Sequence, residues 1–400
     1  MSTSGTALEG LLVLELSSVL AGPAVGQFLA ELGAQVIKVE NPRTRGDVTR
    51  HWKLATEAAH DDRPAYFCAV NWGKASLALD LTQASHRMVF HRLAARADVL
   101  IQNYKPGVAE RFEADYPTLQ ALNPRLIYVD ITAYGPEDPR PGFDAIIQAE
   151  SGFTHLNGPA DGGPTKLPVA LMDLLTAHQA KQGILLALLQ RTQHGQGTYL
   201  TVSLLRSAVS ALANQATNWL VGGVVPQRQG SDHPNIVPYG TAFTAADGQP
   251  LVLAVGTERQ FEALCDVLGV QWHTEPAFAT NAARVVHRAA LHAKLTEAFQ
   301  AQPLDHWLQT LTEAGVPVGA VRAMDRVFDH PEAAAALLTH RRPDGHTEHG
   351  LRGVAFAFAG DHPGLPLTPP PSLHQDAETV LNRLDLPADV RRAILDQPVG

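Results

Sequence analysis

Cysteine is nearly absent from this 400-residue chain, which holds only Cys68 and Cys265. Two thiols far apart in the sequence, with no Cys-x-x-Cys pair, exclude a disulfide framework and the common cysteine-based zinc and redox motifs. Histidines are more numerous, but none falls in an H-E-x-x-H pattern, so we expect no metal site.

An excess of basic residues and a long hydrophobic run are also missing. Lys and Arg total 31 against 40 Asp and Glu, a net charge of −9, whereas proteins that grip nucleic acid usually carry the opposite sign. The apolar run 184–189 is far shorter than the roughly 20 residues of a membrane span, and the first ten residues do not form a signal peptide. We therefore expect a cytoplasmic protein whose partners include neither nucleic acid nor a membrane.

Apolar residues make up 45% of the chain, and their pattern alternates between strand and helix. The opening βαβ unit has strands at 11–16 and 35–39 around a helix at 24–32, which ends at Gly33. Further strands are expected at 75–79, 99–102, 126–131 and 199–203, with helices at 83–97, 108–113, 118–122, from Leu174 to about 191, and at 204–221. This alternation predicts an α/β fold with a parallel, doubly wound sheet.

Composition suggests where this α/β part is interrupted. Gly, Pro and polar residues cluster at 222–240, so we assign 1–221 to a large domain and 222–328 to a smaller α+β domain. The return segment, 329–400, contains a Pro-rich stretch at 363–372 and a helical stretch at 377–384 that could dock on the large domain.

The turn after the first strand raises the question of a dinucleotide site. A strand, a glycine turn, a helix and a strand ending in Glu40 form the Rossmann outline, but G-x-G-x-x-G is missing. Gly22 and Pro23 would then only turn the chain and start the helix. Basic residues near the expected strand ends could form a phosphate clamp or be solvated surface charge: Arg43, Arg45, Arg50, Lys74, Lys105 and Arg111.

Asp173 is the most informative acidic residue. It follows the apolar segment 169–172 and precedes the helix expected from Leu174, which is the usual position of an N-cap. A nucleophilic role is compatible with this position, because the positive end of the helix dipole would keep the carboxylate ionised. Both interpretations stay open at this point.

In their order along the chain, several segments resemble the class III CoA-transferase family, the CaiB/BaiF type. They are LLVLELSSVLAGPAVGQFLAELGAQVIKVENP, NWGKASLALDL, ADVLIQNYKPGVAERF, LNPRLIYVDITAYGPEDPRPGFD, VALMDLLTA, HGQGTYLTVSLLRS and AGVPVGAVRAMDRVFDHPE. The resemblance implies that Asp173 is catalytic. It places the CoA site at Leu20, Ala21, Asn71, Lys74, Asn103, Tyr104, Lys105, Arg111, Phe143 and Asp144.

The resemblance also implies an assembly and a reaction. Family members form an interlocked homodimer of ring-shaped chains, with a Rossmann-like large domain built from the N- and C-terminal parts. They move CoA from an acyl-CoA donor to a carboxylic acid through an aspartyl anhydride and an aspartyl-CoA thioester, with CoA as a substrate and no tightly bound cofactor. The segments 214–222 and 233–243 look most like the succinyl-CoA:glutarate branch, so we expect succinyl-CoA as donor and a dicarboxylate as acceptor, whose distal carboxylate Arg228 or Arg45 could bind.

Two alternatives remain on the same fold. An α-methylacyl-CoA racemase needs a second acid/base, and the resembling racemases carry histidine where this chain has Phe143. A non-catalytic acyl-CoA-binding protein would not need Asp173. Trp72, Asn41 and Arg206 depart from the family pattern, and the first two bear on the CoA contacts. For the oxyanion of the reaction we expect N–H donors from the glycine-rich segment 222–240.

Overall fold

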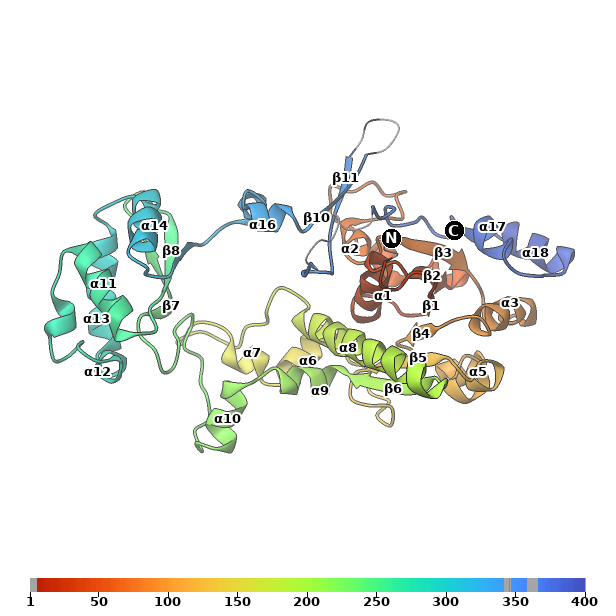
Figure 1. The fold of residues 1–400 in the computed structure, drawn as a ribbon, viewed down its shortest axis with the longest axis horizontal. Helices are drawn as coiled ribbons and strands as arrows, with labels where there is room; N and C mark the ends of the chain where they lie inside the picture. Colours follow the sequence, from red (N-terminus) through yellow and green to blue (C-terminus); the bar gives the residue numbers. More distant parts are fainter. Residues whose placement is uncertain (1–5, 342–344, 346, 358–365, 400) are drawn as a thin grey trace. The chain divides into compact units, whose positions relative to one another are not determined.

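The computed structural model describes residues 6–341, 345, 347–357 and 366–399 (Figure 1). The chain forms two compact units. The first comprises Met1–Ser151, Pro168–Ala216 and Ala335–Gly400, and the second comprises Gly152–Leu167 and Thr217–Ala334. The sequence did not predict that the short segment Gly152–Leu167 leaves the first unit and joins the second.

A six-stranded sheet forms the centre of the first unit. Its order is β3-β2-β1-β4-β5-β6, and every neighbouring pair is parallel. The strands are β1 (Leu12–Glu15), β2 (Gln35–Glu40), β3 (Lys74–Ala78), β4 (Val99–Gln102), β5 (Ile127–Thr132) and β6 (Thr198–Ser203). The predicted doubly wound α/β fold is therefore confirmed. The strand order reverses between β1 and β4, and in sheets of this kind ligands bind outside the carboxyl ends of such a pair.

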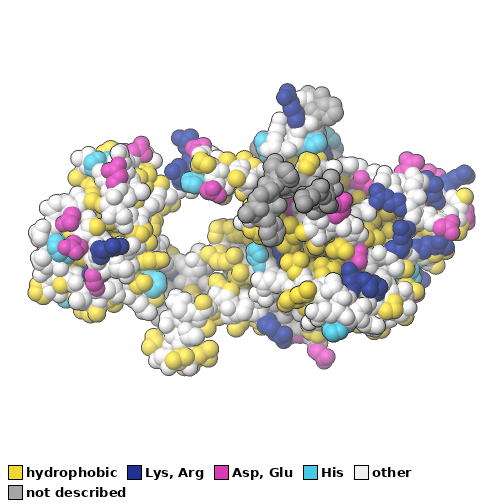
Figure 2. Space-filling model, viewed as in Figure 1, with side chains coloured by type: hydrophobic (Ala, Val, Ile, Leu, Met, Phe, Trp, Pro, Cys, Tyr) yellow, Lys and Arg dark blue, Asp and Glu magenta, His cyan; other side chains and the backbone are white. Residues whose placement is uncertain are grey.

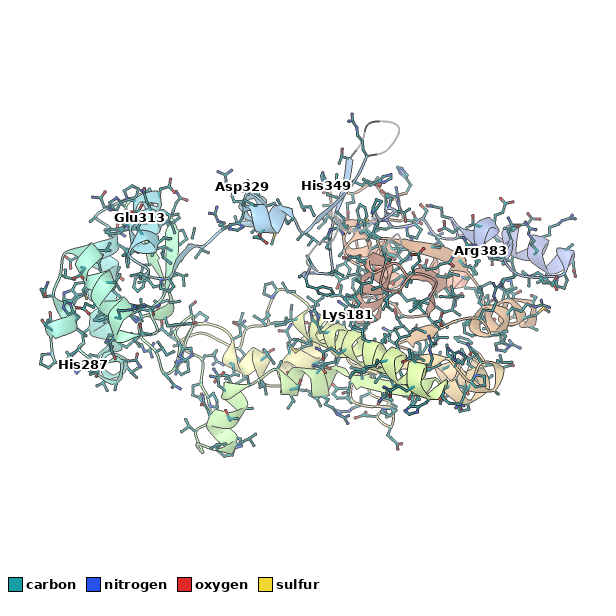
Figure 3. All side chains as sticks on the ribbon, viewed as in Figure 1. Lys181, His287, Glu313, Asp329, His349 and Arg383 are labelled. Atoms are coloured by element: carbon teal, nitrogen blue, oxygen red, sulfur yellow. The ribbon has the colours of Figure 1, made fainter. Side chains whose placement is uncertain are left out.

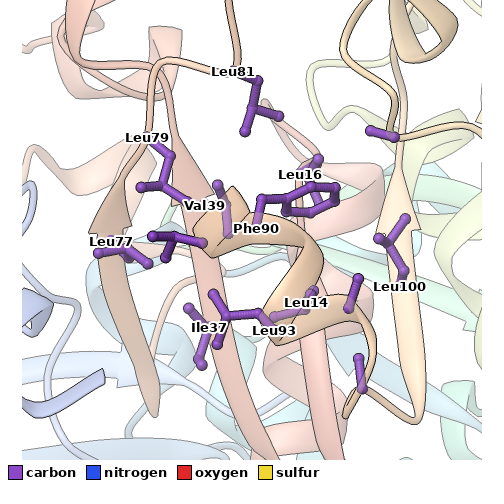
Figure 4. Close-up of a cluster of buried hydrophobic side chains, with 14 of the residues drawn as sticks. Leu14, Leu16, Ile37, Val39, Leu77, Leu79, Leu81, Phe90, Leu93 and Leu100 are labelled. Atoms are coloured by element: carbon purple, nitrogen blue, oxygen red, sulfur yellow. The ribbon is translucent and has the colours of Figure 1, made fainter. Parts of the chain in front are cut away.

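One face of this sheet carries an aliphatic core (Figure 4). Leu14, Ile37, Leu77 and Leu100 alternate with residues that point to the other face, as the two-residue period of a strand requires. Helices α3 (Ala84–Ala94), α5 (Tyr116–Leu122), α17 (Ala377–Leu381) and α18 (Ala388–Leu395) contribute buried residues to the same core. The C-terminal helices thus complete the core of the first unit.

The opposite face is covered by α1 (Ala21–Glu31) and α8 (Leu171–His194), and it is partly polar. Glu15, Lys38, Glu40 and Lys74 lie on it, each less than 5% exposed. Gly26 of α1 passes so close to this group that a Cβ there would lie 1.9 Å from Oε2 of Glu15. Glycine is therefore required for α1 to pack on the charged strand residues.

Several shorter elements complete the first unit. They are the 3₁₀ turns Pro42–Thr44 and Val48–His51, the helices α2 (Ala65–Cys68), α4 (Val108–Arg111), α6 (Asp144–Glu150) and α9 (Leu204–Ser210), and the antiparallel hairpin β10 (Leu337–Arg341) and β11 (Thr347–Leu351). The prediction of a single helix at 204–221 is wrong. Two helices, α9 and α10 (Asn214–Leu220), occupy this range, and Ala213 directly before α10 takes a left-handed φ of 47°.

The second unit is a small α+β body. Its antiparallel sheet has the order β7 (Tyr239–Thr244), β8 (Pro250–Ala254) and β9 (Val318–Ala320). The helices are α7 (Phe153–Leu156), α11 (Glu258–Leu268), α12 (Asn281–Val286), α13 (Arg288–Phe299), α14 (Leu304–Glu313), α15 (Met324–Val327) and α16 (Pro331–Ala334), with a 3₁₀ turn at Trp272–Thr274. The core of this unit includes Phe243, Phe261, Leu295 and Trp307.

Two predictions on the chain's overall character can be compared with the described residues. Within them, no helix is long and apolar enough to cross a membrane. The Pro-rich stretch expected to be extended is free of helix and strand at 366–372, whereas its positions 363–365 lie outside the described residues.

Candidate functional site

The switch point between β1 and β4 brings two turns together. After β1, the N–H of Ser18 donates to Oδ1 of Asn103 at 3.0 Å, and Nδ2 of Asn103 donates back to the carbonyl of Ser18 at 2.9 Å. Asn103 directly follows β4, so this reciprocal pair ties the two strand ends into one surface. Gln102 extends the connection, because its Oε1 accepts from the N–H of Tyr104 at 2.6 Å.

Five of the residues predicted to line a CoA site lie on these two turns. Leu20 and Ala21 stand at the start of α1, and Asn103, Tyr104 and Lys105 follow β4. Lys105 is exposed. Tyr104 lies against the aliphatic core, where burial raises the pKa of its hydroxyl to about 12. The structure thus gathers these positions at the place where open α/β sheets bind ligands.

Asn71 and Lys74 lie beneath the first turn of α1. Nζ of Lys74 donates to Oδ1 of Asn71 at 2.8 Å and to the carbonyl of Pro23 at 2.9 Å, and it pairs with Glu15 at 2.8 Å. Asn71 is fully buried, and Lys74 is 3% exposed. Lys74 is the first residue of β3 and so lies at the amino end of that strand.

The expected clamp of basic residues therefore divides in two. Arg50 is 1% exposed, and its guanidinium donates to both carboxylate oxygens of Glu40 at 2.8 Å, so this charge is neutralised inside the unit. Arg43, Arg45 and Arg111 are exposed. Of these arginines, Arg43, Arg45 and Arg111 can contact a phosphate without breaking a buried ion pair, whereas Arg50 cannot.

Asp173 lies in the first turn of α8, a helix of 24 residues. The helix begins at Leu171 after Ala170, so Asp173 is the third helical residue and the N-cap interpretation is wrong. The far end of α8 is anchored by Arg191, which pairs with Asp98 at 2.8 Å and donates to the carbonyl of Arg125. Both partners directly precede strands at the amino edge of the sheet, so the first turn of α8 is directed to the carboxyl edge.

The middle of α8 packs on α1. Nζ of Lys181 lies 5.0 Å from the ring centre of Phe28 on α1, a cation–π geometry (Figure 3). Burial lowers the pKa of this ammonium group, and the nearby Glu31 opposes the shift. The contact fixes how α8 crosses α1 and so helps to orient the turn that carries Asp173.

The carboxyl of Asp173 is hard to ionise. Burial and then the neighbouring carboxylate of Asp144 raise its pKa from 3.8 to about 7, and no described residue donates a hydrogen bond to it. This upward direction opposes the expectation that the helix terminus keeps the carboxylate ionised, because burial disfavours the charged form. At neutral pH the group exists as acid and carboxylate in similar amounts.

Asp144 sets the shape of this site as well as its charge. It opens α6, and its Oδ1 accepts from the N–H of Met172 at 2.8 Å while its Oδ2 accepts from Nε2 of Gln148 at 2.6 Å. The first of these bonds ties α6 to the first turn of α8. The preceding Phe143 is 60% exposed, so its ring is available to a ligand.

Tyr66 is a site residue that the sequence did not indicate. Burial raises the pKa of its hydroxyl, and the charges of Asp173, Asp144 and Asp47 raise it further, so the phenol lies within electrostatic range of these carboxylates. Its ring packs edge-on against Trp52 at 5.0 Å. A neutral phenol beside Asp173 can donate a hydrogen bond to an oxygen that develops charge.

The glycine-rich segment 222–240, expected to supply oxyanion donors, belongs to the second unit. There the N–H groups of Gly222, Gly223 and Gly230 already donate to the carbonyls of Thr217, Trp219 and Gly158. Arg228, one candidate for binding a distal carboxylate, donates from Nη1 to the carbonyl of His155 at 2.8 Å. These three glycine amides could serve an oxyanion only after exchanging their partners.

Trp72 explains one departure from the family pattern. It is 1% exposed and stands against the β10–β11 hairpin, where a Cβ on Gly350 would lie 2.1 Å from its Nε1. The ring therefore fills the interior between β3 and the hairpin. In the described part of the chain, no group of three or more His, Cys, Asp or Glu residues could hold a metal ion.

The chemistry of this unit is that of a buried carboxylate with raised basicity, next to a sheet edge suited to a ligand. Comparison with known proteins identifies the family. Residues 8–377 match the sequence family described as CoA-transferase family III. The chain is 39% identical over 336 residues to the succinate–glutarate CoA-transferase of Agrobacterium fabrum, a match that covers 82% of this chain and 83% of that protein.

Further relatives extend the similarity. The succinyl-CoA:glutarate CoA-transferase of Homo sapiens is 36% identical over 332 residues, covering 81% of this chain and 74% of that one. The crystal structure of a CaiB/BaiF family protein from Brucella suis superposes with a TM-score of 0.83 at 38% identity, covering 96% of this chain and all of that one. The resemblance seen in the sequence is confirmed: the chain belongs to CoA-transferase family III and is a CoA-transferase.

Proposed function

We propose that this enzyme moves CoA from succinyl-CoA to a second dicarboxylate, with Asp173 as the nucleophile. The observation that carries the proposal is the buried Asp173 carboxyl, whose pKa is about 7, at the first turn of α8 in a chain of family III. Carboxylate nucleophiles divide a difficult exchange into easier covalent steps. The dicarboxylate substrates are supported by relatives named for succinate and glutarate.

The proposed reaction begins when the Asp173 carboxylate attacks the thioester carbonyl of the donor. The C–S bond breaks, which gives a mixed anhydride on Asp173 and the CoA thiolate. The thiolate then attacks the aspartyl carbonyl, so that the donor acid leaves as its carboxylate and a thioester joins Asp173 to CoA. The acceptor carboxylate attacks this thioester, and the same steps in reverse release the new acyl-CoA and the free carboxylate of Asp173.

We assign CoA to the β1/β4 edge and the acyl group to the Asp173 pocket. The gathering of Leu20, Ala21, Asn103, Tyr104 and Lys105 at one sheet edge supports this assignment. Asn71 and Lys74 support the turn from below. Arg111, the last residue of α4, and Phe143, directly before α6, are exposed. Asp144 would position the nucleophile, since it bonds to the N–H of Met172.

We also propose the interlocked homodimer of ring-shaped chains. Exposed apolar side chains support a large interface: Leu186 and Leu189 on α8, and Trp219, Leu220 and Val221 at the end of α10. Figure 2 shows hydrophobic side chains gathered on the surface of α10. Patches of this kind on a soluble chain usually mark an interaction surface. Light scattering should give the mass of a dimer, and Trp219→Asp should reduce it or cause misfolding, whereas a monomeric wild type contradicts the proposal.

Our proposal for the location is the cytoplasm, which is supported by the free thiols of Cys68 and Cys265. Cell fractionation with an antibody to the protein tests it. Recovery in a membrane or secreted fraction would contradict the assignment.

The decisive test is covalent trapping. The enzyme is incubated with succinyl-CoA and no acceptor, then digested under acidic conditions and analysed by mass spectrometry. We expect the peptide that contains Asp173 to gain the mass of CoA less water, and Asp173→Asn should not gain it. A catalytically active wild type that never forms this adduct would contradict the nucleophile.

A donor-by-acceptor panel tests the substrate class. Succinyl-, acetyl-, formyl- and oxalyl-CoA are each offered with mono- and dicarboxylates, and new acyl-CoA is measured by chromatography. We expect succinyl-CoA with a dicarboxylate to give the highest kcat/KM. Faster transfer to monocarboxylates would overturn the substrate assignment, and exchange of an α-proton without transfer of CoA would overturn the reaction.

A further inference from the structure

The turn between β1 and α1 contains a strained residue. Val19 has a φ of 72°, in the left-handed region that β-branched residues rarely occupy. For a residue other than glycine, this conformation is unfavourable enough to change a local equilibrium by roughly tenfold. Leu20 and Ala21 follow immediately, so the backbone proposed to meet CoA depends on a conformation that the turn would not hold by itself.

Two buried charged side chains hold this turn. Oδ1 of Asp47 accepts from the N–H of Val19 at 3.3 Å, and Nζ of Lys38 donates to the carbonyl of Ser17 at 2.8 Å. The same two side chains pair with each other at 2.9 Å, with side chains that are each 1% exposed. The ion pair therefore contacts the backbone on both sides of Ser18.

The pair is itself held rigidly. Oδ1 of Asp47 also accepts from the N–H and hydroxyl of Thr49, at 3.0 and 2.9 Å, and the N–H of Asp47 donates to Glu40 at 2.9 Å. Lys38 in turn pairs with Glu15 at 2.8 Å. These contacts come from β1, β2 and the loop after β2, so the position of the pair is determined by the sheet.

Folding alone gives little reason for such a pair. Removing two charges from water is costly, and well-packed apolar residues often replace a buried ion pair without loss of stability. What an apolar pair could not supply is an acceptor for the N–H of Val19 and a donor for the carbonyl of Ser17. We propose that Lys38 and Asp47 are positioning residues: they hold the turn 17–20 in its left-handed form and thereby preset the surface that binds CoA.

This inference rests on the proposed CoA site, and it assigns the pair to affinity for CoA, distinct from the chemistry at Asp173. Its test is Asp47→Asn, which keeps the shape of the side chain. It removes the charge that pairs with Lys38 and replaces the carboxylate acceptor for the N–H of Val19 by a weaker amide acceptor. The affinity for CoA is measured by calorimetric titration, together with kcat, both KM values and the melting temperature. We expect CoA binding and the KM for acyl-CoA to weaken about tenfold, while the KM for the acceptor acid and kcat change less than twofold.

Asp98→Asn is the matched control. Asp98 also pairs with a mostly buried cation, Arg191, at 2.8 Å and accepts from a backbone N–H of β1, that of Leu12, at 2.9 Å, but at the amino edge of the sheet. It should lower the melting temperature and leave the affinity for CoA unchanged. Equal weakening of CoA binding by both variants would reduce the pair to a purely structural role and overturn the inference.

A rescue variant separates strain from charge. In the background of Asp47→Asn, Val19→Gly removes the cost of the left-handed conformation, so most of the lost affinity should return. Should Asp47→Asn fail to fold, Lys38→Gln is measured in its place with the same expectation. Wild-type affinity in the single variant, or no recovery in the double variant, would overturn the inference. A wild type that binds CoA but transfers it to no acid would instead refute the proposed function.

Discussion

Replacing Asp173 by asparagine should stabilise the protein, and the gain should depend on pH. Asparagine has nearly the same shape but cannot ionise. In the wild type the carboxyl has a pKa of about 7 in the folded protein, against 3.8 for an ordinary aspartate. Burial is the main cause, so ionising the group in the folded state requires free energy that the unfolded chain does not need.

The sign follows from where the proton is bound. Below pH 3.8 the carboxyl is protonated in both states and contributes no difference. As the pH rises towards 7, the unfolded chain releases the proton while the folded chain retains it, so the wild type loses stability throughout this window; above 7 the loss is constant. One pKa unit corresponds to about 1.4 kcal/mol, so the loss reaches roughly 4 kcal/mol at pH 8 and is less than half of that at pH 5.

The assay is thermal unfolding of the wild type and Asp173→Asn at pH 5 and pH 8. We expect the variant to melt several degrees higher at pH 8, with a much smaller difference at pH 5. Asp47→Asn supplies a control of opposite sign. Although burial opposes ionisation there, the charge of Lys38 and the hydrogen bonds from Thr49 keep the pKa of Asp47 low, so this variant should be less stable at pH 8. An equal gain at both pH values, or none, would refute the reasoning for Asp173.

Three further predictions concern the pH dependence of the reaction, the packing at Gly26 and the role of Lys105. Because the nucleophile must be ionised, kcat/KM should fall about tenfold per pH unit below pH 7, and Asp144→Asn should move this limb to lower pH in a pH–rate profile. Gly26→Ala should destabilise the protein by about 2 kcal/mol, as its Cβ would meet Glu15 at 1.9 Å; Gly163→Ala, with open space around the added carbon, should melt as the wild type does. Lys105→Ala should raise the KM for acyl-CoA severalfold without changing the KM for the acceptor acid. Because Lys105 is exposed, the difference in KM between variant and wild type should shrink in high salt, and a salt-independent difference would contradict a phosphate contact.

The α/β architecture could be predicted because its signals are local. The residues around β1, α1 and β2 carry a strand-length apolar run, a helical stretch that ends at Gly33 and a second apolar run, and each indicates its element without help from the rest of the chain. The break before α10 could not be foreseen in the same way. The apolar pattern continues across it, and the left-handed Ala213 has none of the Gly or Asn signal that usually marks such a turn.

The buried charges show what a local pattern cannot indicate. Lys38 and Lys74 have the appearance of surface residues, because lysine is seldom buried without a partner. Both pair with Glu15 on β1, which lies next to β2 and two strands from β3, and only the register of β1, β2 and β3 brings the three side chains to one face. A sequence-based interpretation that assigns every basic residue near a strand end to a ligand therefore overcounts.

Asp173 was indicated by family resemblance, yet its surroundings were not. Asp144 comes from α6, 29 positions before Asp173 in the sequence, and its charge together with burial by the surrounding side chains raises the pKa of the Asp173 carboxyl. A helix N-terminus taken alone favours the charged form. Burial reverses that expectation, and burial is a property of the packed unit.

The raised pKa of Asp173 also bears on why a carboxyl can serve as the nucleophile in this unit. An ordinary aspartate is almost fully ionised at pH 7 but is weakly basic, so it attacks a thioester poorly and leaves an anhydride readily. A carboxyl with a pKa of about 7 is only about half ionised at pH 7. Its carboxylate form is more basic, and a pKa near the operating pH gives the best balance between the ionised fraction and the reactivity of that form. The same desolvation that destabilises the fold thus makes the attacking carboxylate more reactive. The most stable form of this site, with asparagine, would be the one that cannot react.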